Sequence, residues 1–406
     1  MWDASSGAEQ KVLSGHTSDI SSVAFSSDGT HIISGSLDRC VRVWNASSGA
    51  ELKVLNGHTS DVSSVAFSSD GTCIASGSWD NSVWVWDALS GDELKVLKGH
   101  TSDISSVAFS SDDTHIVSGS LDKSVQVWNA LSGDVKVLNG HTNKVSSVAF
   151  SSDGTCIVSG SWDRSIRMWN VSDGAELKVL NGHTSKVSSV AFSSDGTHII
   201  SGSSDRSVRV WDALSGDELK VLNGHTSDVS SVAFSSDGTH IVSGSWDNSV
   251  RLWDLNGVEL KVLKGHTHKF SSVAFSSDGT HIISASWDKT VQVLDASSGA
   301  KLKVLYGHTG AIRSVAFSSD GTHIVSGADD CSVRVSIVEP LFSPWTCTKD
   351  NWIITLPGRD RLMWVPHDIP LYFPPTKLII SRLGSASINF EHSKIGYDWA
   401  NCYVPS

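Results

Sequence analysis

The chain has 406 residues, six cysteines and a formal net charge of −12. An acidic chain without a Lys/Arg cluster is expected to repel phosphate backbones, so the composition argues against a nucleic-acid partner. No stretch approaches the ~18 apolar residues of a membrane span, so we expect no membrane insertion.

The first residues, Met1, Trp2 and Asp3, do not begin the basic and then apolar pattern of a secretory signal. The cysteines show no paired spacing of the zinc or disulfide type. These two observations predict reduced thiols and a cytoplasmic protein.

One unit recurs eight times before Ser336, and each copy opens with a Gly-His pair. Successive copies are 41 or 42 residues apart, with the histidines at His16, His58, His100, His141, His183, His225, His266 and His308. A fixed period in this range indicates a propeller or a solenoid, in which no unit buries its apolar face alone. Function is then expected on the assembled surface.

Each unit contains four short β runs separated by turns. In the sixth copy we expect strands at residues 218–222, 229–234, 240–245 and 249–253, in chain order. Four short runs with tight turns predict a four-stranded antiparallel meander, which needs further sheets stacked on its faces. The sequence therefore predicts an all-β fold.

Four polar or aromatic residues recur in the unit at fixed spacing: a His, a Ser 18 residues later, an Asp and a Trp. The complete sets are His16/Ser34/Asp38/Trp44, His58/Ser76/Asp80/Trp86, His100/Ser118/Asp122/Trp128, His141/Ser159/Asp163/Trp169, His183/Ser201/Asp205/Trp211 and His225/Ser243/Asp247/Trp253. Units seven and eight have Leu294 and Ser336 in place of the Trp.

These units resemble the WD-repeat β-propeller family, whose repeats open with Gly-His and close with Trp-Asp. The resemblance implies a buried network in which Asp accepts from His, His bonds Ser, and Ser meets the indole N–H. Buried polar groups are tolerated only when they have such partners. We therefore expect the blades that contain Leu294 and Ser336 to be the loosest part of the ring.

Ser, His and Asp are also the residue types of a hydrolytic triad. The trio recurs in every unit, whereas a nucleophile need occur only once. The chain contains no phosphate-binding loop, nucleophile elbow or zinc-protease motif. The pattern therefore predicts a non-catalytic protein without a cofactor.

The number of blades follows from how the ring closes. The first outer strand, near residues 9–13, has no unit ahead of it, and the last three strands, at residues 312–335, have no outer strand after them. In the WD-repeat family such chain ends pair, which predicts eight four-stranded blades. Seven blades with one displaced unit, or nine with the C-terminal tail, remain alternatives.

Two positions vary between otherwise near-identical units. In a WD-repeat ring, the residue before the turn Asp faces the top of the ring; we call this the pre-turn position. Its occupants are Leu37, Trp79, Leu121, Trp162, Ser204, Trp246, Trp287 and Asp329. The third residue after each Gly-His histidine is the entry position, occupied by Asp19, Asp61, Asp103, Lys144, Lys186, Asp228, Lys269 and Ala311.

Large apolar side chains on a surface and Trp in particular are typical of partner sites, and charge patterning orients a partner. We expect the pre-turn and entry positions to form one partner-binding site for a protein or peptide on a monomeric ring. Packing of each indole over its own turn, and a merely solvated rim, are the alternatives.

A second set of histidines falls on the opposite side of the predicted ring: His31, His115, His198, His240, His281 and His323, with Cys73 and Cys156 in equivalent places. Neighbouring blades are stacked sheets ~10 Å apart, so these side chains are not expected to share a metal ion. We predict no metal site.

The composition changes near residue 338. All eight prolines lie from Pro340 onward, and charges balance in that segment. This predicts a propeller at residues 1–338 and a β-rich appendage at residues 339–406, with strands near residues 351–355, 361–365, 377–381 and 387–390.

The amino-acid sequence of the tail, from Trp352-Ile353-Ile354 to Trp399-Ala400-Asn401, resembles that of the tail after the WD repeats of fungal NACHT-type immune-receptor-like ATPases. That resemblance implies a ligand sensor coupled to a nucleotide-binding switch. The initial Trp2-Asp3 resembles the closing pair of a further unit, so we expect a longer ancestor or a longer reading frame. The alternative is a stand-alone adaptor, such as a ubiquitin-ligase receptor or signalling hub.

Overall fold

The computed structural model describes residues 10–338 and, beyond them, the strand residues 345–347, 352–355, 361–364, 371–372, 377–381 and 385–389. The chain divides into two compact units, Met1–Ile337 and Val338–Ser406. All assigned elements in the described residues are strands, and none of these residues forms a helix long and apolar enough to cross a membrane.

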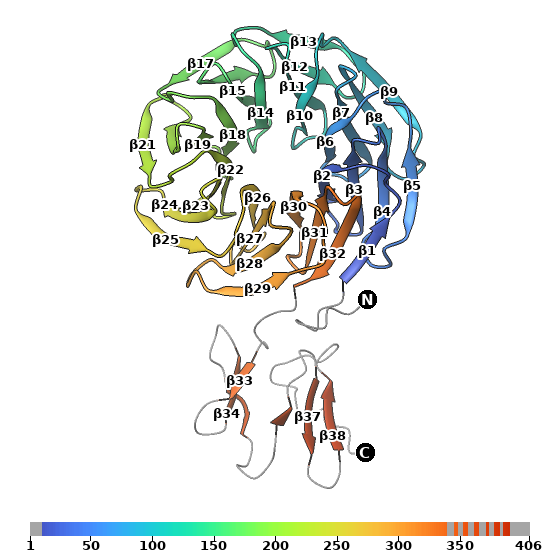
Figure 1. Cartoon of the computed structure of the whole chain (residues 1–406), viewed down its shortest axis with the longest axis vertical. Coiled ribbons are helices and arrows are strands. Elements are labelled where there is room, and N and C mark those ends of the chain that lie inside the picture. The colour runs from blue at the N-terminus through green and yellow to red at the C-terminus, as the bar shows by residue number, and fades with distance from the viewer. Residues whose placement is uncertain are drawn as a thin grey trace. The chain divides into compact units, whose positions relative to one another are not determined.

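The first unit is a ring of eight four-stranded antiparallel sheets (Figure 1). The strands nearest the centre are β2 (Ile20–Phe25), β6 (Val62–Phe67), β10 (Ile104–Phe109), β14 (Val145–Phe150), β18 (Val187–Phe192), β22 (Val229–Phe234), β26 (Phe270–Phe275) and β30 (Ile312–Phe317). The second strands are β3 (His31–Ser36), β7 (Cys73–Ser78), β11 (His115–Ser120), β15 (Cys156–Ser161), β19 (His198–Ser203), β23 (His240–Ser245), β27 (His281–Ser286) and β31 (His323–Ala328).

The third strands are β4 (Val41–Asn45), β8 (Ser82–Asp87), β12 (Val125–Asn129), β16 (Ser165–Asn170), β20 (Ser207–Asp212), β24 (Ser249–Asp254), β28 (Val291–Asp295) and β32 (Ser332–Ile337). The outer strands are β5 (Glu51–Leu55), β9 (Glu93–Lys98), β13 (Val135–Leu138), β17 (Glu176–Asn181), β21 (Glu218–Asn223), β25 (Glu259–Lys264), β29 (Lys301–Leu305) and β1 (Gln10–Ser14). We number the blades 1 to 8 by their inner strands, β2 to β30.

The two ends of the first unit close the ring. Strand β1 pairs antiparallel with β32, and Leu13 lies opposite Val333. Blade 8 therefore takes three strands from the last repeat and one from the first. This arrangement confirms eight blades and excludes both the seven-blade and the nine-blade alternatives.

The sixth unit shows how well the strand limits were predicted. Its inner and second strands, β22 and β23, have the predicted limits, whereas β21 ends at Asn223 and β24 at Asp254, each one residue later. The first outer strand likewise ends at Ser14. These differences lie at strand ends, where pairing fades gradually.

The core lies between the blades. The second strand is buried almost throughout because it has a neighbouring sheet on both faces, as in β23. Between blades 5 and 6, for example, Ile200 and Val208 pack against Val229, Ile241 and Trp253. The blades therefore share cores pairwise, as the sequence period requires.

Polar contacts join the inner strands of adjacent blades as well. The single O–H of Ser146 is shared between the carbonyl of Gly160 in its own blade, at 3.0 Å, and that of Val187 in the next blade, at 2.6 Å. Gly160 also has no room for a side chain, because a Cβ there would lie 2.7 Å from Val187 Cγ1. Glycine and serine in the repeat thus permit close blade packing.

In the second unit, β33 (Trp345–Cys347), β34 (Trp352–Thr355) and β35 (Arg361–Trp364) form one three-stranded sheet. A second sheet contains β36 (Leu371–Tyr372), β37 (Lys377–Ser381) and β38 (Ser385–Asn389). The pairs β34–β35 and β37–β38 correspond to the two predicted hairpins. Strands β33 and β36 were not predicted, and Trp399 lies outside the described residues.

Candidate partner-binding face

The recurring His, Ser, Asp and Trp form one buried hydrogen-bonded chain in each of blades 1–6. In blade 5, His183 Nδ1 lies 2.8 Å from Asp205 Oδ2 and His183 Nε2 lies 2.8 Å from Ser201 Oγ. The Trp211 indole N–H donates to the same hydroxyl oxygen at 2.9 Å. The corresponding contacts in blades 1–6 all measure 2.8 to 2.9 Å.

A single proton arrangement satisfies every member of this chain. With Nδ1–H donating to the carboxylate, Nε2 accepts from the serine hydroxyl, whose oxygen accepts from the indole. The arrangement stabilises the turn and the strand pair, and it does not present a nucleophile.

The serines and tryptophans of this network are closed to any partner or substrate. The serines are completely buried at Ser34, Ser76, Ser118, Ser159, Ser201 and Ser243. The tryptophans are only 1% or 2% exposed at Trp44, Trp86, Trp128, Trp169, Trp211 and Trp253. None of these predicted site residues therefore belongs to an accessible functional site, and their contribution is to the stability of each blade. A candidate partner-binding face therefore has to be sought among other side chains.

The aspartate of the network is held in its ionised form. Burial is the largest influence and raises the pKa of Asp205, but hydrogen bonds from His183, Ser207 and the Thr184 N–H outweigh it. The pKa of Asp205 therefore lies well below its usual value. A carboxylate that accepts several hydrogen bonds shows this behaviour even when partly buried.

The third-strand residue that faces the Gly-His pair is a feature that sequence reasoning missed. In blade 1 it is Arg42, which pairs with Glu51, and a Cβ on Gly15 would lie 2.7 Å from the Arg42 Nη1. In blade 2 it is Trp84, stacked on Trp86 with ring centroids 5.0 Å apart. The glycine before the histidine is therefore a close-approach residue in blades 1–7, and a varying third-strand position was the available signal.

The pre-turn and entry positions lie side by side in every blade. The pre-turn N–H donates to the entry carbonyl at 2.8 to 2.9 Å, in the pairs Leu37–Asp19, Trp79–Asp61, Leu121–Asp103, Trp162–Lys144, Ser204–Lys186, Trp246–Asp228, Trp287–Lys269 and Asp329–Ala311. The structure thus brings the two variable sets together on one face of the ring. We call the face that carries these two turns the top face.

The indoles at the pre-turn position are accessible to different degrees. Trp79, Trp162 and Trp246 are 47%, 42% and 36% exposed. Trp287 is half-buried, as are Leu37 and Leu121. Three exposed indoles on one face form an apolar surface that polar turns alone would not provide.

Cations and indoles alternate across blades 4 to 8. The ammonium nitrogen of Lys186 lies 4.9 Å from the ring centroid of Trp162, and that of Lys269 lies 4.0 Å from the centroid of Trp246. We call Lys144, Trp162, Lys186, Trp246, Lys269 and Trp287 the lysine–tryptophan arc. Sequence reasoning placed these residues on the top face but did not predict their contacts across blades.

The arc ends at an ion pair in blade 8. Arg313 lies over Trp287, 4.8 Å from the ring centroid, and binds Asp329 through two hydrogen bonds of 2.6 and 2.7 Å. Burial raises the pKa of the neighbouring Asp19, and the Asp329 carboxylate adds to the effect. Arg313 replaces the inner-strand serine of the other repeats and was not among the predicted site residues.

A family model described as WD domain, G-beta repeat matches the chain eight times, at residues 7–45, 49–87, 91–129, 133–170, 174–212, 216–254, 257–295 and 299–335. The chain belongs to the WD-repeat family. Among solved structures, the WD-repeat ring is similar to the computationally designed Ika8 protein, with 34% sequence identity and a TM-score of 0.72 over 80% of this chain and 98% of that chain. No curated protein matches the chain.

The opposite face of the WD-repeat propeller carries the second set of histidines. Each of these histidines contacts the threonine that precedes it in the turn. The Thr239 hydroxyl, for example, lies 2.7 Å from His240 Nδ1. Within the described part of the chain, no three His, Cys, Asp or Glu side chains are grouped closely enough to hold a metal ion.

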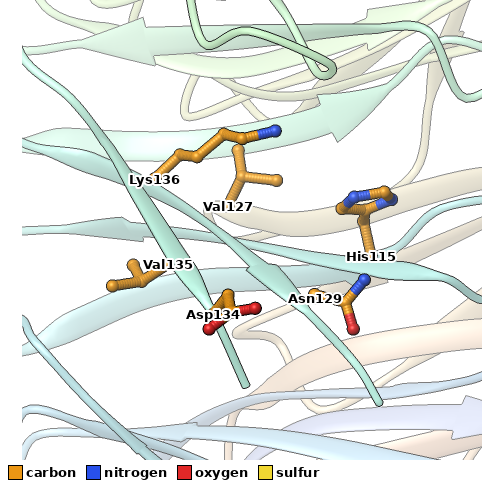
Figure 2. A pocket seen from close by; sticks show the side chains of 6 residues that line it. All are labelled: His115, Val127, Asn129, Asp134, Val135 and Lys136. Carbon is orange, nitrogen blue, oxygen red and sulfur yellow. The ribbon is translucent and has the colours of Figure 1, made fainter. Parts of the chain in front are cut away.

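A small hollow lies in blade 3, where the loop before the outer strand is one residue shorter than in most repeats. Figure 2 shows its lining by His115, Val127, Asn129, Asp134, Val135 and Lys136. All six side chains come from β11, β12, β13 or the connecting loop. None belongs to the top-face positions, so the hollow does not contribute to the candidate site.

Proposed function

We propose that this propeller is a non-catalytic recognition scaffold that binds a protein or peptide over its top face. WD-repeat propellers are scaffolds for protein interaction, and the pairing of a variable indole with a variable charge supports this face as the site. The observation that carries the proposal is the exposure of Trp79, Trp162 and Trp246 on that face. Indoles are frequent energetic centres of protein interfaces.

The proposed contact set consists of the pre-turn and entry side chains, namely Leu37, Trp79, Leu121, Trp162, Trp246, Trp287, Asp19, Asp61, Asp103, Lys144, Lys186, Asp228 and Lys269. Their side chains converge from consecutive blades, so one partner could contact several repeats. We propose a monomeric ring without nucleic-acid partners, located in the cytoplasm.

The test replaces Trp79, Trp162, Trp246 and Trp287 by Ser and compares capture of cellular proteins by immobilised wild-type and variant chains. We expect loss of the captured set with an unchanged circular-dichroism spectrum. The matched control replaces Leu89, Leu131 and Leu214 by Ser, since these are 85% to 88% exposed in loops of the opposite face. Equal loss in both variants, or unchanged capture by the Trp variant, would refute the top-face assignment.

We further propose that the propeller serves as the ligand-sensing part of a fungal NACHT-type signalling protein. The amino-acid sequence of the tail supports this sensor role. A stand-alone adaptor is the second candidate, because the ring closes on its own strands. Mapping the 5′ end of the transcript distinguishes the sensor from the adaptor. An upstream phosphate-loop segment supports the sensor, and transcription beginning at Met1 supports the adaptor.

A further inference from the structure

The lysine–tryptophan arc places its ammonium groups next to indole rings. Lys186 lies between two indoles, 4.9 Å from the centroid of Trp162 and 6.0 Å from that of Trp246. Lys269 lies between Trp246 and Trp287, at 4.0 and 5.6 Å. Attraction between an ammonium and an indole face favours these positions and reduces the freedom that a lysine would lose on binding a ligand.

The lysines of the arc keep their charge available. Several arginines in residues 10–338 pair with carboxylates, among them Arg42, Arg167, Arg209, Arg251 and Arg313. No ion pair joins Lys144, Lys186 or Lys269 to a carboxylate in that part of the chain. Three unneutralised cations next to indoles form a surface that is complementary to carboxylates beside apolar groups.

Blades 1 to 3 carry the opposite charge on the top face, and Asp228 in blade 6 is the single entry carboxylate within the sector of the arc. The entry positions of blades 1 to 3 are Asp19, Asp61 and Asp103, and the Asp329 carboxylate lies near enough to raise the pKa of Asp19. A long polyanion that continued around the ring would meet these carboxylates. The charge pattern therefore favours a short acidic segment confined to blades 4–7 over a nucleic acid strand.

We propose that the lysine–tryptophan arc binds an acidic peptide segment in which carboxylates alternate with apolar side chains. The carboxylates bind the ammonium groups of Lys144, Lys186 and Lys269, and the apolar side chains lie on the indoles of Trp162, Trp246 and Trp287. The inference rests on the proposed top-face function and adds the chemical class of the partner. Arg313, already paired with Asp329, limits the site at blade 8.

The test measures fluorescence anisotropy of three dodecapeptides carrying a neutral dye, with alternating Glu–Leu, Gln–Leu or Lys–Leu sequences, and of dodecathymidylate. We expect the Glu–Leu peptide to bind about tenfold tighter than the Gln–Leu peptide, and more weakly as salt rises. The variant Lys186→Gln/Lys269→Gln should weaken Glu–Leu binding about tenfold. Lys220→Gln is the control, since Lys220 is exposed on outer strand β21.

The remaining outcomes of this binding experiment distinguish the acidic-segment inference from the proposed recognition of peptides by the top face. Equal binding of the Glu–Leu and Gln–Leu peptides, or binding of the Lys–Leu peptide alone, would overturn the acidic-segment inference while leaving peptide recognition intact. Thymidylate binding as tight as that of Glu–Leu and weakened by the same lysine changes would assign the arc to nucleic acid. Binding of no probe would count against both the inference and the proposed function.

Discussion

Blades 1–6 and blades 7–8 adopt the same four-stranded sheet although they differ in the residue that completes the buried network. In blades 1–6 an indole donates to the serine, whereas Leu294 and Ser336 occupy that place in blades 7 and 8. The His–Asp and His–Ser contacts persist, with His266 Nε2 lying 3.0 Å from Ser284 Oγ and His308 Nε2 lying 2.9 Å from Ser326 Oγ. The indole is therefore not required for the strand arrangement.

Blade 7 compensates for the smaller Leu294 with a larger neighbour. Phe270 and Leu294 belong to one core cluster. Blades 1–6 have Val or Ile together with Trp at these two positions, as at Val187 and Trp211. The Phe270 ring lies 4.6 Å from the His266 ring, edge to face. Total volume is thus kept while its distribution changes, which cores tolerate well. Blade 8 shows no such exchange at Ser336, which is buried.

The largest expected effect comes from giving blade 5 the residue of blade 7 without its compensation. Trp211→Leu leaves a cavity and removes the donor to Ser201, so we expect a loss of about 3 kcal/mol in the free energy of unfolding. Urea denaturation followed by far-ultraviolet circular dichroism measures it. Adding Val187→Phe should recover part of this loss. If the losses of the two single variants simply add in the double variant, exchange of volume does not explain the packing of blade 7.

The reverse exchange in blade 7 should have a somewhat smaller effect. Phe270→Val removes buried ring volume and Leu294→Trp overpacks the core beside Phe270, so each alone should cost about 2 kcal/mol. The double variant should lie within about 0.5 kcal/mol of the wild type because the two changes restore the arrangement of blades 1–6. Two independent, summed losses in the same denaturation experiment would contradict this coupling.

Amide hydrogen exchange compares the blades without mutation. The sequence predicted loose packing in both blades 7 and 8, but the Phe270–Leu294 compensation leads us to expect it in blade 8 alone. Amides of β32 should exchange about tenfold faster than those of β20, whereas those of β28 should match β20. Equal protection in all three strands would remove the proposed role of the indole in local stability.

Acid sensitivity should also distinguish blade 7. Burial, the largest influence, raises the pKa of Asp288, but hydrogen bonds from His266 and Thr290 outweigh it and lower the pKa from 3.8 to about 2. A depressed folded-state pKa gives stability that is present above the unfolded value and is lost as pH falls through the folded value. The contribution of Asp288 should therefore disappear between about pH 4 and pH 2.

Asp205 provides the comparison because its pKa in blade 5 is lowered further. In melting curves from pH 5 to pH 2, the destabilisation caused by Asp288→Asn should shrink first and that of Asp205→Asn should persist to lower pH. Simultaneous disappearance of the two effects would show that the two carboxyls titrate alike.

The repeat itself determined most of the fold. Because the period and the spacing within each unit are constant, the resemblance to WD repeats implied the same network in every unit, as at His183, Ser201 and Asp205. The predicted meander places Trp162 and Lys144 on one face, since the turn and the strand entry lie at the same end of the sheet. Residues related by a fixed local topology can be located from sequence.

Tertiary structure decided the relations between blades. The angle between adjacent sheets is not encoded in any one unit, so the predicted eight blades were decided over seven only by the observed pairing of β1 with β32. The placement of Lys269 over Trp246 of the preceding blade depends on that angle and on side-chain direction. The compensation between Phe270 and Leu294 is likewise a property of a shared core, because packing volume is filled jointly by side chains from two sheets.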